Sequence, residues 1–357
     1  MLIFDCHLDL SMNALEWNRD LTQSVAQIRA REKGRADKTD RARGTVALPD
    51  MRRGKIGLCV ATLIGRHVAP GNPLPGWHSP EIAWAMTQGQ LAWYRAMEDA
   101  GQMEQVTTVE QLDKYVKLWN GNPPDDTPVA YILSLEGADS IRTPLHLELA
   151  YSQGLRALGP AHYGAGRYSP GTHHTGGLTA IGRELVQEMD RLGMILDVTH
   201  LTDDAFWEAL KLFNGPIWAS HSNCRTLVPD QRQFDDDQLK ALIERRAVIG
   251  GALDAWMMIP GWIRGKTTPA SSGVKLAHLI DHWDHICQLA GNAKNIGVGT
   301  DLDGGYGLEQ SPGDIDTIAD LQRLPEMLTE RGYKAEDIPQ IMHGNWVRFL
   351  HEAWKPK

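Results

Sequence analysis

Apolar and polar positions alternate in blocks along the chain. Short apolar runs, often β-branched and bounded by Gly or Pro, recur between longer stretches whose apolar residues follow a helical spacing. The runs that predict strands are 2–9, 57–64, 129–135, 155–161, 194–199, 217–220, 247–253 and 295–300. The stretches that predict helices are 81–100, 178–192, 203–213, 235–245, 274–290 and 315–331, with terminal helices in 335–354. This alternation is typical of repeated β-α units around a parallel sheet.

Eight predicted strands alternating with helices predict an α/β fold, with residues 1–357 forming a single (β/α)8 TIM-type barrel domain with C-terminal helices. A doubly wound open sheet is the alternative, but no GxGxxG fingerprint follows a predicted strand. Inserted loops are predicted at 18–43, 70–80 and 164–177. Long β-α loops of a barrel lie over its active face, whereas the charged run 18–43 is expected to be a solvated helix or loop.

The composition excludes several classes of protein. A net charge of −9 without a block of Lys or Arg argues against a nucleic-acid partner. The four cysteines are scattered and form no CxxC pair, so neither a zinc knuckle nor a disulfide framework is predicted. No leader pattern precedes the first strand, and no apolar run reaches the roughly 18 residues that span a membrane. We therefore expect a cytoplasmic protein without a membrane partner.

The first predicted strand carries the first sign of chemistry, because His7 and Asp9 stand two positions apart in an apolar run. Alternate residues of a strand share a face, so the imidazole and the carboxylate are expected to converge on one point. Burying both groups is costly unless something compensates, and a divalent metal ion is the obvious candidate. The pair opens the hypothesis of a metal site.

Other strand ends add groups of the same kind. Each one alone has an ordinary explanation, since a His at a strand end is often hydrogen-bonded and an Asp often caps the next helix. Six of the eight predicted strands nevertheless deliver such a group, and unpaired buried charges are rare. The set therefore favours a metal site and consists of His7, Asp9, Glu136, His162, His200, His221 and Asp301.

The donor set indicates the metal and the reaction class. Imidazoles and carboxylates without a thiolate suit Zn²⁺ and also accept Co²⁺ or Mn²⁺. Seven groups are more than one tetrahedral ion uses, so they predict a dinuclear centre. Two ions sharing a water would generate hydroxide near neutral pH and polarise a carbonyl. The predicted reaction is hydrolysis of an amide or an ester.

Several segments resemble those of the membrane (renal) dipeptidase family of amidohydrolase-like barrels. They keep the family's order over nearly the whole chain and are 5–10, 134–138, 176–182, 192–200, 219–222, 297–304 and 344–348. The resemblance implies two zinc ions per subunit and hydrolysis of small L,D- or L,L-dipeptides by a hydroxide that bridges the ions. It also suggests a homodimer.

The resemblance assigns a role to each matching residue. It implies that His7 and Asp9 bind one zinc, His200 and His221 bind the other, Glu136 bridges them, Asp301 carries the proton to the leaving amine, His162 stabilises the carbonyl as it becomes tetrahedral, and Arg232 holds the substrate carboxylate. The segment 158–164 and Gln233 depart from the family's common sequence. Both departures fall in the substrate-facing region, so they concern substrate choice more than metal binding.

Some assignments stay open at the level of sequence. Arg232 could grip a carboxylate through its planar guanidinium or form a surface salt bridge with Asp230 or with 235–237. Asp303 and Asn345 could support the site or cap helices.

Other functions stay open as well. We expect His173 and His174 to be loop histidines rather than ligands, because no strand end holds them. The alternative enzymes are an acyl-amino-acid deacylase or a lactonase with the same metals. A metal-binding scaffold without catalysis is the alternative from a different class.

Overall fold

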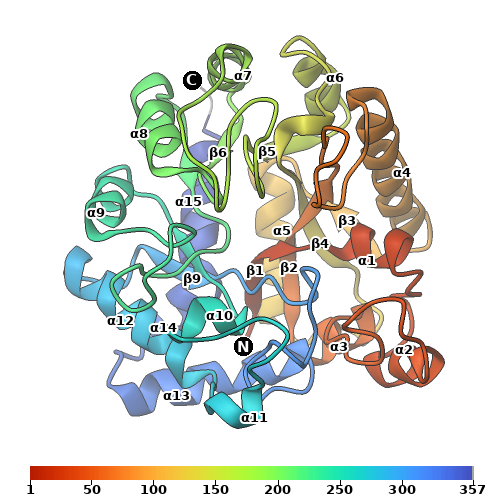
Figure 1. Ribbon diagram of the computed structural model, residues 1–357. Helices are drawn as coiled ribbons and strands as arrows, with labels where there is room; N and C mark the ends of the chain where they lie inside the picture. Colours follow the sequence, from red (N-terminus) through yellow and green to blue (C-terminus); the bar gives the residue numbers. More distant parts are fainter. Residues whose placement is uncertain (356–357) are drawn as a thin grey trace.

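A ring of parallel strands lies at the centre of the structure, a computed structural model that describes residues 1–355. Helices surround these strands (Figure 1). One sheet runs in the order β1-β2-β4-β5-β6-β7, and β8 pairs with β9. Within the described residues the ring consists of β1 (Ile3–Leu8), β2 (Ile56–Ile64), β4 (Val129–Glu136), β5 (Leu155–Gly159), β6 (Ile195–Asp197), β7 (Ile217–Trp218), β8 (Ile249–Gly251) and β9 (Ile296–Val298).

Contacts at two seams close the ring. A parallel bridge between Ala219 and Ile249 joins the end of β7 to β8. At the other seam the Asp5 carboxylate on β1 accepts hydrogen bonds from the Thr300 main-chain N–H and hydroxyl, at 2.9 and 2.6 Å. The Asp301 N–H also donates to the His7 carbonyl oxygen at 3.3 Å. The predicted α/β barrel is confirmed, and the open-sheet alternative is wrong.

Most of the longer helices lie close to the predicted positions, whereas α5 (Val109–Asn120) was not predicted. The longer ones are α4 (Pro80–Asp99), α5 (Val109–Asn120), α7 (Ala180–Leu192), α8 (Asp203–Leu212), α9 (Asp236–Glu244), α12 (Ala277–Ala290) and α15 (Asn345–Ala353). The shorter ones are α1 (Leu10–Glu16), α2 (Val25–Glu32), α3 (Leu48–Arg53), α6 (His146–Ser152), α10 (Ala255–Met258), α11 (Pro269–Ser272), α13 (Leu324–Arg331) and α14 (Asp337–Pro339). Tight turns lie at Ala138–Ser140 and Ile318–Arg323, and a wide π turn lies at Gln340–Gly344. No helix within residues 1–355 is long and apolar enough to cross a membrane.

The structure differs from the prediction in one helix and one additional strand. The predicted helix 315–331 is a 3-10 turn (Ile318–Arg323) followed by α13, because Pro325 in the first turn of α13 lacks the N–H that a continuous α-helix needs. A short strand, β3 (Met103–Gln105), pairs with the start of β4 and was not predicted. Three residues are too few to show a periodic pattern.

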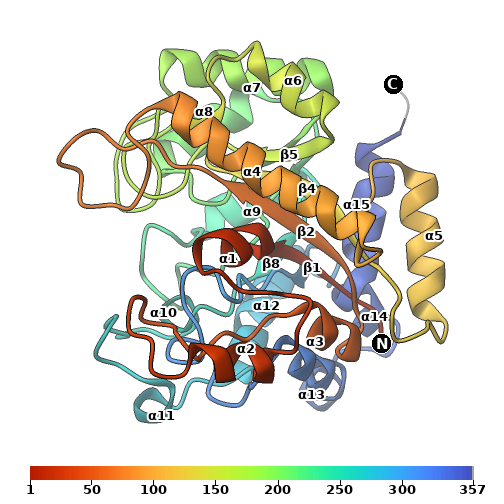
Figure 2. The same cartoon turned by 90° about the vertical axis from the view of Figure 1, so that its right-hand side faces the viewer.

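One end of the barrel is closed by α5 and α15, whose buried side chains form a cluster with those of the strands. Figure 2 shows both helices on the side opposite to the long loop that follows β2. The indole of Trp346 on α15 lies 5.9 Å from the ring of Trp218 and donates to the Val298 carbonyl oxygen at 3.0 Å. Gly297 permits this approach, since a Cβ there would lie 2.4 Å from the indole nitrogen.

The charged insertion 18–43 contains a helix and many exposed residues, as predicted, but one face of it is buried. Arg19, Glu32, Asp40 and Arg41 are buried. Arg19 pairs with Glu32 at 2.9 Å and with Asp40 at 2.8 Å, while Arg41 pairs with Glu32 at 2.7 Å. Opposite charges offset one another in this network, so these four side chains are buried while much of the segment still faces water.

Candidate metal centre

The seven strand-end groups predicted from the sequence meet at one place. Glu136, the last residue of β4, is at the centre of this group. Its Oε1 lies 3.1 Å from His200 Nε2, 3.4 Å from His221 Nε2 and 3.5 Å from His7 Nε2. Its Oε2 lies 3.7 Å from His162 Nε2. Parallel strands present their carboxyl ends at one rim of a barrel, which explains why residues far apart in sequence meet there.

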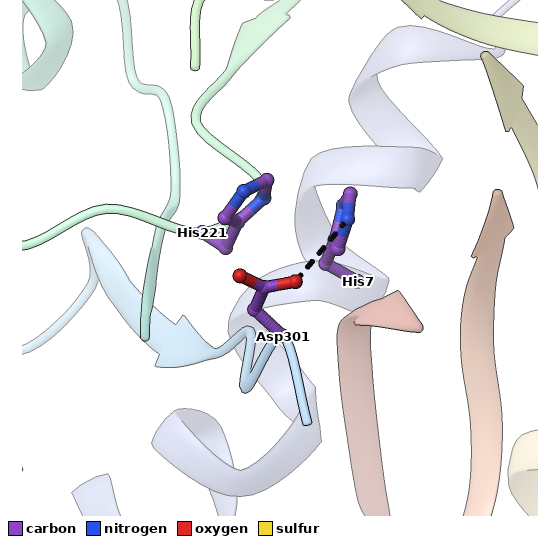
Figure 3. A group of neighbouring side chains, drawn as sticks. All are labelled: His7, His221 and Asp301. Carbon is purple, nitrogen blue, oxygen red and sulfur yellow. Dashed lines mark ion pairs between the residues drawn. The ribbon is translucent and has the colours of Figure 1, made fainter. Parts of the chain in front are cut away.

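Asp9 and Asp301 complete the group around His7. The Nε2 of His7 lies 3.8 Å from a carboxylate oxygen of each. Figure 3 shows His7, His221 and Asp301 gathered from three strand ends, with the His7–Asp301 pair dashed. In three sets of residues, one donor atom from each residue lies within 4.8 Å of the others. The sets are His7, His221 and Asp301; Glu136, His162 and His200; and His7, Asp9 and Glu136.

The backbone turns sharply where two of these groups leave their strands. His200 and Asp301 have φ angles of 69° and 58°, in the left-handed region. That region costs free energy for residues with a side chain, although Asp and His occupy it more readily than most. Both residues therefore keep a strained conformation where their side chains join the cluster.

Hydroxyl groups orient three of the imidazoles. Thr172 Oγ1 lies 2.7 Å from His200 Nδ1, and Ser220 Oγ lies 2.9 Å from His221 Nδ1 and 3.4 Å from His7 Nδ1. These contacts leave the Nε2 atom of each ring facing the cluster. Partners of this kind are typical of metal-binding histidines, whose other ring nitrogen is hydrogen-bonded to a second group.

Burial and mutual repulsion govern the protonation of the cluster. Burial raises the pKa of Glu136 to about 7 and that of Asp301 well above its usual value. Burial also lowers the pKa values of His200 and His221 well below the ordinary value. In His7, the effect of burial is outweighed by Glu136 and Asp9, which raise its pKa to about 10. Without a metal, the protein thus crowds carboxylic acids that resist losing protons around a His7 that keeps its proton, while His200 and His221 stay neutral.

The residues present fit a divalent metal. The buried Nε2 of His7 has no hydrogen-bond partner within residues 1–355, although three carboxylates surround it. Neutral imidazoles offer lone pairs, and a cation would favour the charged form of the crowded carboxylates. Nitrogen and oxygen donors without sulfur suit Zn²⁺, Co²⁺ or Mn²⁺.

Arg232 lies under the cluster rather than on the surface. It is 3% exposed, and its guanidinium donates to the His221 carbonyl oxygen at 2.8 Å and to Ser222 Oγ at 3.3 Å. Asp230 accepts a hydrogen bond from its main-chain N–H only, at 2.8 Å. A surface salt bridge, one of the two explanations of Arg232, is therefore wrong.

Aromatic side chains pack beside the cluster, and the ring of Tyr163 lies 5.3 Å from that of His200. The Arg264 guanidinium lies 4.6 Å from the ring centroid of Trp256 and donates to the Tyr163 hydroxyl at 2.9 Å. Asp254, after β8, accepts a hydrogen bond from the Trp256 indole at 2.6 Å. His173 and His174 lie on the exposed loop, outside the metal-donor clusters found in residues 1–355.

Asp303 and Asn345 support the barrel rather than joining the cluster. Asp303 accepts hydrogen bonds from the N–H groups of Thr45 and Val46, at 2.7 and 3.0 Å. The Asn345 side chain donates to the carbonyl oxygens of Ala293 and Ile296, at 2.7 and 2.8 Å.

Three further residues of the site escaped the sequence analysis: Thr172, Ser220 and Arg66. Arg66 follows β2 and hydrogen-bonds to His162 Nδ1. A signal for Arg66 did exist, because the strand-end rule that found the other groups also applies to Gly65-Arg66 after the second strand. Thr172 lies in a loop and carried no such signal.

The chain is similar to known proteins along nearly its whole length. A family model described as membrane dipeptidase (peptidase family M19) matches residues 1–356. A Klebsiella pneumoniae protein described as an uncharacterized protein in the pqqA 5′ region is 29% identical over 240 residues, 65% of this chain and 84% of the relative. Dipeptidase tcpJ of Claviceps purpurea is 30% identical over 184 residues, 51% of this chain. That match spans only 39% of the length of dipeptidase tcpJ.

A solved structure has the same fold. It is a metallopeptidase from Rhodobacter sphaeroides liganded with a phosphinate mimic of the dipeptide L-Ala-D-Ala. The two structures superpose with a TM-score of 0.80 at 24% identity, covering 99% of each chain. At this identity the likeness concerns the arrangement of the chain.

Proposed function

The chain belongs to the membrane dipeptidase family, peptidase family M19, and from this premise we propose that it is a metal-dependent dipeptidase that hydrolyses the amide bond of small dipeptides. The observation that carries the proposal is the convergence of three imidazoles on one carboxylate oxygen of Glu136, within 3.1 to 3.5 Å. A buried arrangement of this kind is costly unless a cation joins it.

We propose that the cations are two zinc ions. His7 and Asp9 would hold one ion, His200 and His221 the other, and Glu136 would bridge them. When bound, the ions would supply Lewis acidity, which lowers the pKa of a water and polarises the scissile carbonyl. The donor set supports this choice of metal, and the number of donors supports two ions rather than one.

The chain's own residues would bind the substrate and move the proton. The Arg232 guanidinium would hold the carboxylate of the dipeptide, since a planar fork matches two carboxylate oxygens. His162 would donate an N–H to the scissile carbonyl oxygen as negative charge develops there. Asp301, whose pKa burial raises, would take a proton from the attacking water and deliver it to the leaving amine.

A panel of substrates tests the proposal. Hydrolysis of L-Ala-D-Ala, L-Ala-L-Ala, N-acetyl-Ala and a simple lactone would be measured before and after chelation and after zinc restoration, with bound metal counted by mass spectrometry. We expect cleavage of the free dipeptides, abolished by the chelator and restored by zinc, with two ions per chain. Metal-dependent cleavage confined to N-acetyl-Ala or the lactone would move the function to a deacylase or lactonase. Bound metal without turnover of any substrate would indicate a scaffold.

The dipeptide mimic bound to the Rhodobacter sphaeroides protein supports including an L,D-dipeptide in the panel. We also propose that the protein acts in the cytoplasm as a homodimer. Fractionation of the source cells and analytical ultracentrifugation of the purified protein would test location and oligomeric state separately.

A further inference from the structure

Four histidines meet at the cluster, and one of them has a different hydrogen-bond partner. The Nδ1 atoms of His7, His200 and His221 face hydroxyl oxygens of Ser220 and Thr172. The Nδ1 of His162 instead faces the guanidinium of Arg66.

The type of partner decides which nitrogen of a neutral ring carries the proton. A hydroxyl accepts as well as donates, so a ring N–H at Nδ1 can point to it and leave a lone pair at Nε2. A guanidinium only donates. The Nδ1 of His162 must therefore be the nitrogen with the lone pair, and the proton of the neutral ring lies on Nε2.

We propose that Arg66 is a positioning residue that holds His162 in the Nε2–H form, as a hydrogen-bond donor facing the cluster rather than as a metal ligand. That the donor serves a substrate carbonyl rests on the proposed function. The tautomer itself does not, because it follows from the hydrogen bond alone.

Spacing by itself would admit His162 as a ligand. Its Nε2 lies 3.7 Å from Glu136 Oε2, and donor atoms of Glu136, His162 and His200 lie within 4.8 Å of one another. Binding a metal through Nε2 would require a lone pair there while Nδ1 accepts from Arg66. A neutral imidazole has only one such nitrogen, so Arg66 distinguishes His162 from the other three histidines.

The loop that carries Arg66 is braced at several points. Arg66 Nη1 donates to the Pro75 carbonyl oxygen at 2.8 Å, and the Trp77 N–H donates to the Arg66 carbonyl oxygen at 2.8 Å. The neighbouring His67 N–H donates to the buried carboxylate of Asp139 at 3.1 Å. Asp139 lies three residues after Glu136, so the loop is tied to the strand end that carries the central carboxylate.

Two substitutions separate the hydrogen bond from the bulk of the side chain. Arg66→Met keeps the length of the side chain and removes its donors, whereas Arg66→Lys keeps a donor. We expect Arg66→Met to lower kcat for L-Ala-D-Ala about 10- to 100-fold with little change in KM, because the donor matters most when the carbonyl gains charge. Arg66→Lys should recover much of the loss. His67→Ala, which leaves the main-chain N–H in place, is the matched control and should keep wild-type kcat.

The decisive readout does not depend on turnover. In zinc-loaded protein labelled with ¹⁵N-histidine, NMR should show His162 as the Nε2–H tautomer in the wild type and in Arg66→Lys. It should show Nδ1–H or a mixture in Arg66→Met, with His162→Gln identifying the signals. The zinc content should be equal in all four proteins.

The outcomes separate this inference from the proposed function. Loss of one zinc per chain in His162→Gln would overturn the inference, because His162 would then be a ligand. An unchanged tautomer in Arg66→Met, or an Arg66→Lys variant as slow as Arg66→Met, would also overturn it. If no dipeptide is cleaved by the wild type, the proposed function fails, while the tautomer and zinc measurements still decide the role of Arg66.

Discussion

Arg232 illustrates how a single residue can indicate what a site receives. A buried guanidinium normally has a carboxylate nearby, because an uncompensated buried charge is costly. The hydrogen bonds of Arg232 go to a carbonyl and a hydroxyl oxygen, and its Nε has no partner within residues 1–355. The free hydrogen-bonding capacity of Arg232 supports its proposed role in binding the carboxylate of the substrate.

Removing the Arg232 guanidinium should weaken binding of substrates with a free carboxylate. For Arg232→Met we expect KM for L-Ala-D-Ala to rise about 10- to 100-fold, the value of one charge-assisted hydrogen bond, with a smaller effect on kcat. Steady-state kinetics with the dipeptide and with its C-terminal amide would measure this effect. The amide should respond little to the substitution.

The matched control for this prediction is Arg225→Met. Arg225 lies in the same segment but pairs with Asp203 at 2.6 Å, away from the cluster. Its substitution should leave KM unchanged. Equal losses for the dipeptide and its amide in Arg232→Met would show that Arg232 does not bind the carboxylate.

At the scale of elements, the insertion that contains α2 depends on its buried ion pairs. Arg19 contacts Glu32 and Asp40, and its Nη1 lies 3.7 Å from Asp303 on the turn after β9. Arg19→Met would leave Asp40 and Asp303 buried without a cation, while Arg41 would still pair with Glu32. We expect the free energy of unfolding to fall by about 3–5 kcal/mol, measured by urea denaturation.

A second arginine of the same segment provides the comparison. Arg31 is 62% exposed and lies 4.0 Å from Asp20. Exposed pairs contribute about 0–1 kcal/mol, so Arg31→Met should change the unfolding midpoint little. Equal effects of the two substitutions would contradict a special role for the buried network.

The turn between β8 and α10 should make stability depend on pH. Burial, the largest influence, raises the pKa of Asp254 from 3.8 to about 6. The folded protein then holds this proton over a range of pH in which the unfolded chain has released it. The contribution of Asp254 to the free energy of unfolding is fully present below about pH 4 and is lost as the pH rises to about 6. This contribution is about 3 kcal/mol at most.

Asp254→Asn should remove this dependence. Urea denaturation at pH 4, 5, 6 and 7, with chelator present so that metal loss does not contribute, would measure it. The difference in the free energy of unfolding between the wild type and Asp254→Asn should fall between about pH 4 and 6. Asp237→Asn, at a residue whose side chain is 83% exposed, serves as the control and should keep the wild-type profile. Parallel pH profiles of wild type and Asp254→Asn would contradict the prediction.

At the scale of the whole molecule, the cluster joins strands from both ends of the chain. His7 belongs to β1, Glu136 to β4, and Asp301 follows β9. A metal bound by these residues binds only the folded barrel, so it should stabilise the barrel as a unit. Free ion at about 100 times its Kd would add roughly 2.7 kcal/mol.

Removing the metal should therefore lower the melting temperature. We expect chelation to lower the midpoint of thermal unfolding by several degrees and added zinc to restore it. The midpoint should rise with the logarithm of the zinc concentration. Scanning fluorimetry with metal counted in the same samples would test this. A midpoint that stays constant after proven loss of metal would contradict it.

Much of the fold follows from local patterns. The strands and most longer helices lie where the apolar spacing predicts them, because periodicity is a property of neighbouring residues. The strand-end rule also predicted which groups meet around Glu136, because parallel strands of a barrel end at one rim.

Other features depend on contacts between distant segments. The sequence by itself determined the barrel and the strand-end groups. The tertiary structure alone decided that Arg19 is buried against Glu32 and Asp303, and that Arg66 and Thr172 face different histidines. The physical reason is that a charge or a hydroxyl takes its role from the partner it meets, and that partner comes from chain closure rather than from sequence spacing.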